Sequence, residues 1–251
     1  MAASGQRVLI VGATSAMAQH CARAWAQRGA AAFILVGRDA RRMEPIVADL
    51  QVRAPQADIR VLTGDLLSTQ GVRDIVDQAC EAGRIDLALI AHGSLPDQHD
   101  CQNDLEQCRT ALEVNGVSPV LFAEAIAGRM ARAGFGTLGI ISSVAGDRGR
   151  RSNYVYGAAK GMVTRYAQGL QHRLAGSPVR VTLIKPGPTD TPMTSQLRER
   201  GASLAPVESV AAAIVTGMDQ GRAVVYAPVK WAAIMMVIRH LPRFLFNKLD
   251  I

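Results

Sequence analysis

The segment SSVAGDRGRRSNYVYGAAK, residues 142–160, is the most informative stretch of this 251-residue chain. The apolar run before it predicts a buried strand, and the sequence from Tyr154 onward predicts a long helix. Tyr156 and Lys160 stand four residues apart, so they share one face of that helix, and Ser143 ends the strand that faces it. An ammonium group beside a phenol lowers the pKa of the phenol. The set therefore predicts a group that donates or accepts a proton near neutral pH, although a Tyr-x-x-x-Lys pair alone also occurs on ordinary helices.

Apolar segments typical of buried strands alternate with helical segments along the whole chain. The predicted strands are residues 7–11, 31–37, 58–63, 87–91, 137–142, 179–185 and 223–226. The predicted helices are residues 15–29, 39–54, 68–80, 103–133 with a break near Gly116, 154–175 and 207–219. This alternation predicts an α/β fold, a Rossmann-type doubly wound sheet of about seven parallel strands with helices on both faces. We expect a single catalytic domain at residues 1–228, followed by residues 229–251 as a C-terminal tail of the same domain.

Several small or polar residues come directly after predicted strands. They are Gly12, Asp65, Gly93, Ser143 and the pair Pro186-Gly187. In a doubly wound sheet, ligands bind beyond the carboxyl ends of the strands. The positions therefore predict one shared site at that edge of the sheet.

The turn after the first strand, GATSAMA at residues 12–18, consists mostly of small residues. Such a turn allows the backbone to approach a pyrophosphate at a helix N-terminus, although a plain strand–turn–helix fits as well. Arg38 follows the second strand, where a carboxylate would bind the ribose 2′-hydroxyl of NAD. An arginine there suits the 2′-phosphate of NADP, and the alternative is a solvated charge at a helix start. We therefore expect NADP(H) to be preferred over NAD(H).

These features occur together and in order, and the chain resembles the classical short-chain dehydrogenase/reductase family over essentially its whole length. The residues that carry the resemblance are Gly12 with its turn, Asp65, Asn115, Ser143, Tyr156, Lys160, Pro186 and Gly187. The resemblance implies a nicotinamide cofactor, hydride transfer to or from a carbonyl carbon, and a homodimer or homotetramer.

The resemblance also implies residue roles. Tyr156 is the implied general acid or base, and Ser143 orients the carbonyl. Lys160 lowers the tyrosine pKa and binds the nicotinamide ribose, while Asn115 supports a proton relay through water. The implied cofactor-binding residues are Gly12, Thr14, Ser15, Ala16, Met17, Arg38, Asp65, Leu66, Ala91, Gly93, Tyr156, Lys160, Pro186, Gly187, Thr189 and Thr191.

The chain departs from the family pattern in two places. Ala16 and Ala18 stand where glycine is usual in the turn. The family's N-N-A-G after the fourth strand is Ile-Ala-His-Gly at residues 90–93. The asparagine that normally braces the central strands is therefore missing.

Residues 146–151 and 225–249 resemble more closely the branch of the family that reduces a decaprenylphosphoryl-2-keto-pentose. This resemblance implies reduction of a ketone to a secondary alcohol on a polyprenylphosphoryl keto-sugar. The alternatives are a reductase of another hydrophobic ketone or 3-oxoacyl substrate, and a non-catalytic NADP-binding partner at a membrane.

The loop before Tyr156 carries Arg148, Arg150 and Arg151. Guanidinium groups bind phosphate in a planar fork, so one or more of them is expected to contact an anionic substrate. Arg148 and Arg151 are the candidates, and the alternative is a solvated basic loop or a subunit contact. Residues 192–205 are polar, helix-prone and placed like a substrate lid.

The segment from residue 230 to the C-terminus mixes apolar and basic residues, and Pro242 divides it. It is too short to span a bilayer but suits an amphipathic segment that lies at a membrane surface. The alternative is packing on the protein body or on a second subunit.

The amino-acid composition indicates which classes of binding partner are favoured. The formal charge of +7 favours anionic partners, but few aromatic residues and no recognition module argue against nucleic acid. The four cysteines lack a C-x-x-C pair and are expected to be free thiols in a reducing compartment. Scattered histidines predict no metal site. The N-terminus lacks the apolar core of a signal peptide, so we expect a cytoplasmic protein, compatible with the inner face of the membrane.

Overall fold

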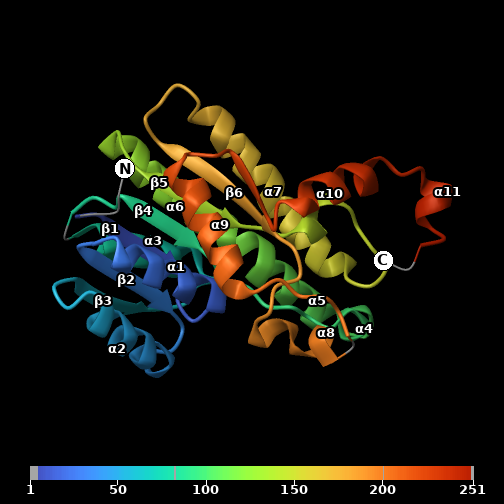
Figure 1. Ribbon diagram of the computed structural model, residues 1–251, viewed down its shortest axis with the longest axis horizontal. Coiled ribbons are helices and arrows are strands. Elements are labelled where there is room, and N and C mark those ends of the chain that lie inside the picture. The colour runs from blue at the N-terminus through green and yellow to red at the C-terminus, as the bar shows by residue number, and fades with distance from the viewer. Residues whose placement is uncertain (1–4, 82, 200, 250–251) are drawn as a thin grey trace.

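The computed structural model describes residues 5–81, 83–199 and 201–249. Seven strands form one parallel sheet in the order β3-β2-β1-β4-β5-β6-β7 (Figure 1). The strands are β1 (Arg7–Val11), β2 (Ala32–Gly37), β3 (Asp58–Thr63), β4 (Leu87–Ile90), β5 (Thr137–Ile141), β6 (Arg180–Pro186) and β7 (Val224–Ala227). The predicted doubly wound sheet is confirmed.

Helices cover both faces of the sheet (Figure 1). The longer ones are α1 (Ala16–Gln27), α2 (Glu44–Arg53), α3 (Thr69–Glu81), α6 (Ser118–Ala133), α7 (Tyr154–Arg173) and α9 (Val207–Asp219). The shorter ones are α4 (Gln98–Asn103), α5 (Leu105–Leu112) and α8 (Ser195–Glu199), together with the 3-10 turns η1 (Arg41–Met43), η3 (Val144–Asp147) and η4 (Pro192–Thr194).

Two separate apolar cores lie on the two faces of the sheet. Val8 and Ile10 of β1 belong to the core under α1, α2 and α9, whereas Leu9 and Val11 belong to the core under α3, α6 and α7. Successive side chains of a strand point to opposite faces. A strand that is buried on both faces therefore needs an unbroken apolar run, as in RVLIV.

The chain order creates a crevice at one end of the sheet. The chain runs outward from β1 through β2 to β3 and then returns to β4 on the other side of β1. Such a reversal opens a crevice beyond the carboxyl ends of the two central strands. The turn that begins at Gly12 and the segment that begins at Ala91 flank this crevice.

The predicted helix at residues 103–133 is interrupted. A π-helical turn, η2 (Glu113–Val117), separates α5 from α6, close to the break expected at Gly116. α5 begins where the Asp104 carboxylate accepts hydrogen bonds from two backbone N–H groups. α6 ends at Gly134, which adopts a left-handed conformation with φ of 66°.

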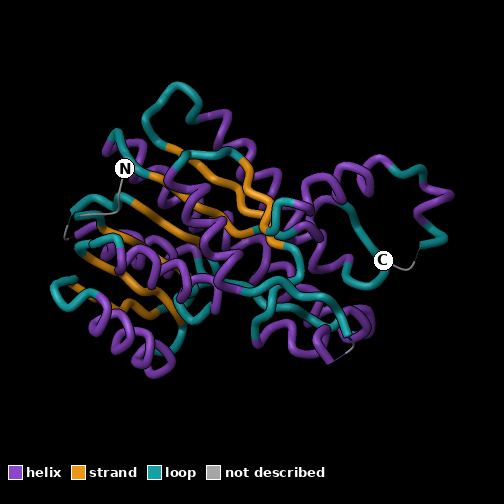
Figure 2. The backbone as a smooth tube through the Cα atoms, viewed as in Figure 1, coloured by secondary structure: helices purple, strands orange, loops and turns teal. Residues whose placement is uncertain are grey.

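The C-terminal tail forms two helices, α10 (Lys230–His240) and α11 (Arg243–Phe246). They lie at one end of the molecule, away from β3 (Figures 1 and 2). Met235 is buried, but most apolar side chains of the tail are exposed. Within the described residues, no helix has the length and apolar character needed to cross a membrane.

Candidate active site

Two adjoining cavities lie beyond the carboxyl ends of the strands. The inner cavity is lined by Ser143, Tyr156 and Lys160, and the outer cleft by the turn after β1 and by Arg38. The residues that line both are Ser15, Met17, Ala91, His92, Gly93, Thr191 and Met193. The two cavities therefore form one continuous binding site.

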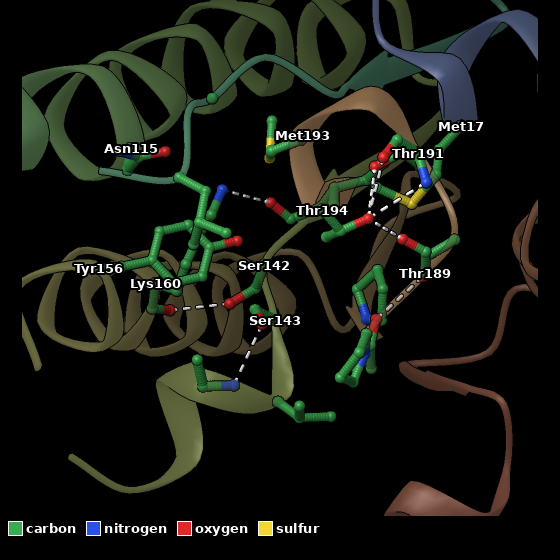
Figure 3. Close-up of a pocket in the computed structure, with 18 of the residues that line it drawn as sticks. Met17, Asn115, Ser142, Ser143, Tyr156, Lys160, Thr189, Thr191, Met193 and Thr194 are labelled. Carbon is green, nitrogen blue, oxygen red and sulfur yellow. Dashed lines mark hydrogen bonds between the residues drawn. The ribbon is translucent and has the colours of Figure 1, made fainter. Parts of the chain in front are cut away.

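Tyr156 and Lys160 project from the same face of α7 into the inner cavity (Figure 3). Their spacing of one helical turn places the Lys160 ammonium 5.8 Å from the centre of the Tyr156 ring. The ammonium donates a hydrogen bond to the backbone oxygen of Ile141 at 3.2 Å. This contact fixes the ammonium against the end of β5.

Burial shifts the pKa values of both α7 side chains. It raises the pKa of Tyr156 to about 12, and a hydrogen bond from Ser143 opposes this shift. It also lowers the pKa of Lys160 to about 8. Desolvation of the phenol is the largest effect on the Tyr156 pKa, and the lowering of that pKa by Lys160 stays a prediction. The Tyr156 phenol is thus protonated at neutral pH.

The two serines at the end of β5 differ in their contacts. The Ser142 hydroxyl donates to the Lys160 backbone oxygen at 2.8 Å and is 2.9 Å from the Thr164 hydroxyl oxygen. The Ser143 hydroxyl accepts from the Ala145 backbone N–H at 3.1 Å and bonds Tyr156. Of the two, Ser143 is the serine whose hydroxyl bonds the Tyr156 phenol.

Asn115 is fully buried in the π-helical turn η2. Its carboxamide accepts from the Ser94 backbone N–H at 2.8 Å and donates to the Ala111 carbonyl at 2.9 Å. A side chain added at Gly93 would lie 2.8 Å from the Asn115 oxygen and 3.5 Å from the Lys160 ammonium. Asn115 and Lys160 therefore approach the same backbone segment after β4.

The turn after β1 fits a bound pyrophosphate. Gly12 has φ of 87°, and a Cβ there would lie 2.5 Å from the His92 nitrogen, so only glycine fits. The Ser15 side chain makes no capping hydrogen bond, and the first turn of α1 holds no acidic residue. The backbone N–H groups at this helix end are thus left for an anion.

The end of β2 brings positive charge to the outer cleft. Arg38 lines the cleft as predicted from its position, and Arg42 from η1 lines it too. Sequence reasoning missed Arg42, although the Arg41-Arg42 pair was a visible signal. The carboxylate of the next residue, Asp39, accepts a hydrogen bond from the Arg41 backbone N–H at 2.9 Å.

One predicted cofactor residue stands apart from the cavities. The Asp65 side chain is exposed and accepts from the Leu67 backbone N–H at 2.9 Å. Neither cavity lining includes it, whereas Leu66 lines the outer cleft. The segment after β3 therefore faces the cleft through Leu66.

The segment after β6 forms the other side of the site (Figure 3). Pro186, Gly187, Thr189 and Thr191 all line the inner cavity. The Thr189 hydroxyl donates to the Gly187 carbonyl at 2.9 Å, which closes a tight turn. The predicted lid follows as the short helices η4 and α8, and it contributes residues such as Met193 to the cavity wall.

His92 supplies a brace where the family asparagine is missing. Its Nε2 lies 2.8 Å from the Ser118 hydroxyl, and that hydroxyl donates its proton to the Leu66 carbonyl. Nε2 therefore carries the proton that bonds Ser118. Burial lowers the pKa of His92 to about 3, so the ring is neutral. The contact ties β4 to α6 and to the segment after β3.

Trp231 and Asn153 line the inner cavity although the sequence did not mark either as a site residue. Trp231 reaches the inner cavity from α10 of the tail, and Asn153 from the residue before α7. The Trp231 indole packs on Gly187, where a Cβ would clash with it. No local pattern in the sequence marks this tail residue as part of a site whose other residues lie far from it in the chain.

The predicted substrate arginines differ in their surroundings. Arg148 donates to the backbone oxygens of Ile238 and Leu241, the latter at 2.8 Å, and its guanidinium lies 3.7 Å from the centre of the Phe246 ring. Arg148 thus binds the tail, and it is Arg150 that lines the inner cavity. Arg151 is exposed.

Two further sequence expectations concern groups outside the cavities. All four cysteines are free thiols, as predicted. Asp97, His99 and Asp100 form an exposed group within 4.8 Å of one another. The Asp97 carboxylate is already the N-cap of α4, because it accepts from two backbone N–H groups there.

The topology and the site together define an oxidoreductase of the Rossmann type. The chain belongs to the short chain dehydrogenase family, whose model matches residues 6–202. It therefore binds a nicotinamide cofactor and acts on a carbonyl or alcohol, as the sequence predicted.

Individual relatives support this placement. The chain is 33% identical to an uncharacterized oxidoreductase of Streptomyces coelicolor over 96% of this chain and 95% of the relative. It is 32% identical to one of Mycobacterium tuberculosis over 96% of each chain. A short-chain dehydrogenase of Burkholderia cenocepacia, solved in complex with NADP, has the same fold with a TM-score of 0.83. The two chains align over their full length at 21% identity.

Proposed function

We propose that the protein reduces a ketone to a secondary alcohol with NADPH as the hydride donor. The observation that carries this proposal is the convergence of Ser143, Tyr156 and Lys160 in one cavity. That cavity continues into a cleft shaped for a dinucleotide. The bound nicotinamide would supply the hydride that reaches the carbonyl carbon.

In this proposal the side chains handle the carbonyl oxygen and its proton. Ser143 and Tyr156 donate hydrogen bonds to the oxygen as negative charge develops there. Tyr156 then gives its proton to the oxygen, since its phenol is protonated at neutral pH. Lys160 and the Asn115 region return a proton to the tyrosine.

The preference for NADP(H) over NAD(H) is part of the proposal. Arg38 and Arg42 place two guanidinium groups at the end of β2, beside the cleft. Guanidinium groups bind phosphate in a bidentate geometry. The 2′-phosphate of NADP would gain two charged partners there. NAD has a 2′-hydroxyl at this position and would not gain these ionic contacts.

We further propose a polyprenylphosphoryl keto-sugar as the substrate. The resemblance of residues 146–151 and 225–249 to a decaprenylphosphoryl-keto-pentose reductase supports this choice. So does the tail, in which exposed Val237 and Phe244 stand near Arg239 and Arg243. Such a segment suits a peripheral contact with an anionic membrane. The protein would then act at the cytoplasmic face of the membrane as a homodimer or homotetramer.

NADPH oxidation tests this function directly. The purified protein would be assayed at 340 nm with a polyprenylphosphoryl 2-keto-pentose in detergent, beside matched assays with NADH. Turnover with NADPH that exceeds turnover with NADH is the expected result. Tight NADPH binding without turnover of this substrate would exclude the keto-lipid as the substrate.

A further inference from the structure

The arginine loop before α7 directs one cation into the inner cavity. Arg148 is held by the tail, and Arg151 has an interaction of its own. Arg150 lines the inner cavity together with Ser143 and Tyr156. The three arginines are thus not equivalent, although the sequence presents them as one basic cluster.

The Arg150 guanidinium is partly buried and lacks an anionic partner. Within the described part of the chain, no carboxylate forms an ion pair with it and no acceptor bonds its side chain. Burial lowers the pKa of Arg150, yet a guanidinium stays protonated. A charge that is partly removed from water is stabilised when an anion enters the cavity.

Asn153 lines the same cavity and carries an unpaired polar atom. Its Oδ1 is buried without a hydrogen-bond partner. Asn153 is the N-cap of α7, where the side-chain oxygen usually accepts from the second or third N–H of the helix. Here the Val155 N–H donates to Gln98 Oε1 at 3.0 Å instead. The Asn153 oxygen is thereby left unpaired on a residue that lines the cavity.

Arg150 and Asn153 line the same cavity as Ser143, Tyr156 and Lys160. The Asn153 backbone N–H donates to the Arg150 carbonyl at 3.1 Å, which joins the two residues in one turn. Tyr156 follows Asn153 by three residues and lines the same cavity. A ligand held by the two side chains in this cavity therefore shares it with the Tyr156 hydroxyl.

We propose that Arg150 and Asn153 form the substrate-recognition subsite of the inner cavity. Arg150 binds an anionic group of the substrate, with phosphate as the expected chemistry, and Asn153 accepts a hydrogen bond from a substrate hydroxyl. The substrate class is thus a hydroxylated ketone that carries phosphate. This inference rests on the proposed carbonyl reduction and assigns the substrate contacts within it.

The test compares two ketones that differ only in phosphate. Dihydroxyacetone and dihydroxyacetone phosphate would be reduced by the wild type, Arg150→Met and Arg150→Lys. Arg165→Met is the matched control, because Arg165 is exposed farther along α7, where its side chain bonds Gln168. The polyprenylphosphoryl 2-keto-pentose forms a third arm, which separates a lipid phosphate from a soluble phosphate ester.

Arg150→Met should lower kcat/KM for the phosphorylated ketones at least about tenfold, the usual effect of losing a charge-assisted hydrogen bond. It should spare dihydroxyacetone, and Arg150→Lys should recover part of the loss. If kcat/KM falls more for the polyprenylphosphoryl ketone, Arg150 binds a lipid phosphate. If it falls more for dihydroxyacetone phosphate, Arg150 binds a soluble phosphate ester. Equal losses on dihydroxyacetone and its phosphate, or no loss on either phosphate, would overturn the proposal.

A binding measurement separates this proposal from the proposed reaction. The NADPH complex of each variant would be titrated with inorganic phosphate by calorimetry, since bound NADPH blocks the 2′-phosphate site. Phosphate binding that Arg150→Met abolishes supports the subsite even when no ketone turns over. Identical phosphate binding by the wild type and Arg150→Met would refute it.

The proposed role of Asn153 is tested separately, by the kcat/KM of a variant for two ketones. Asn153→Leu should lower kcat/KM for dihydroxyacetone but leave a ketone without hydroxyls, such as 2-pentanone, unchanged. An equal effect on both ketones would show that Asn153 only supports the start of α7.

Discussion

Tyr156 and Lys160 show how burial changes the chemistry expected from a sequence pattern. The Tyr-x-x-x-Lys spacing predicts a phenol with a lowered pKa, yet burial raises the pKa of Tyr156 to about 12 and lowers that of Lys160 to about 8. A protonated phenol is the state that a reduction requires, because the carbonyl oxygen must receive a proton. The lysine is then the side chain that titrates near physiological pH.

The Lys160 shift predicts a pH-dependent stability. A lysine in the unfolded chain has a pKa of about 10.4, above its folded value of about 8. Between these values the unfolded state binds more protons, so the contribution of this group to stability rises with pH. Below pH 8 the cost of burying the ammonium is fully present.

Urea denaturation of the wild type and Lys160→Met, repeated from pH 7 to pH 10, measures this effect. The wild type should gain unfolding free energy relative to Lys160→Met as pH rises above 8. A difference between the two proteins that stays constant over this range would contradict the assigned shift.

Arg38 and Arg42 predict the cofactor preference. Arg38→Ser combined with Arg42→Ser should raise KM for NADPH about tenfold or more, because charge-assisted hydrogen bonds to the 2′-phosphate are lost. KM for NADH should change little in the same variant. Equal effects on the two cofactors would show that the arginines do not bind the 2′-phosphate.

At the scale of elements, the loop after β5 joins the active site to the tail. Asp147 in η3 pairs with Lys185 of β6, and both side chains are at most 4% exposed. Tyr226 of β7 donates to the same carboxylate at 2.8 Å. The neighbouring Arg148 binds α10. Asp147 and Arg148 thus anchor the loop that begins at Ser143 to two strands and the tail.

Removal of Asp147 should be costly. Asp147→Ala leaves the Lys185 ammonium buried without its partner, and such a loss typically costs about 3–5 kcal/mol. Tyr226→Phe removes the hydrogen bond to the same carboxylate and the contact of the hydroxyl with Arg239, and it should cost about 1 kcal/mol. Urea denaturation at pH 7 measures both, and equal losses in the two variants would show that the ion pair is not the main contribution.

The sequence predicts the strands and the longer helices well, because their apolar patterns are local. Residues 7–11 match β1, and residues 207–219 match α9. The contacts of Arg148 with the tail and the entry of Trp231 into the cavity depend on residues distant in the chain. Such contacts leave no local sequence pattern, so the sequence does not separate Arg150, which lines the cavity, from the candidates Arg148 and Arg151.

At the scale of the whole molecule, the tail presents an exposed apolar surface beside basic residues. Met235 and Trp231 pack α10 on the body, whereas Val237 and Phe244 are 63% and 67% exposed. From the sequence, the tail was compatible with a segment at a membrane surface and with a segment packed on the protein. The tail combines packing on the body with an exposed apolar surface.

Vesicle sedimentation tests the proposed membrane contact. The protein should bind vesicles that contain phosphatidylglycerol, and binding should weaken at high salt because screening reduces the attraction. Val237→Ser combined with Phe244→Ser should reduce binding severalfold. Leu105→Ser is the control, since Leu105 is 83% exposed on α5 outside the tail. Equal losses in both variants would assign the binding to general hydrophobicity.

The assignment of Tyr156 as the proton donor is the central claim, and the rate of NADPH oxidation by Tyr156→Phe tests it most directly. The substitution removes the phenolic hydroxyl and keeps the aromatic ring in the cavity wall. We expect at least a ~100-fold loss of kcat, on the scale of a positioned general acid, in a variant that still binds NADPH. Turnover by Tyr156→Phe at a rate near that of the wild type would contradict it.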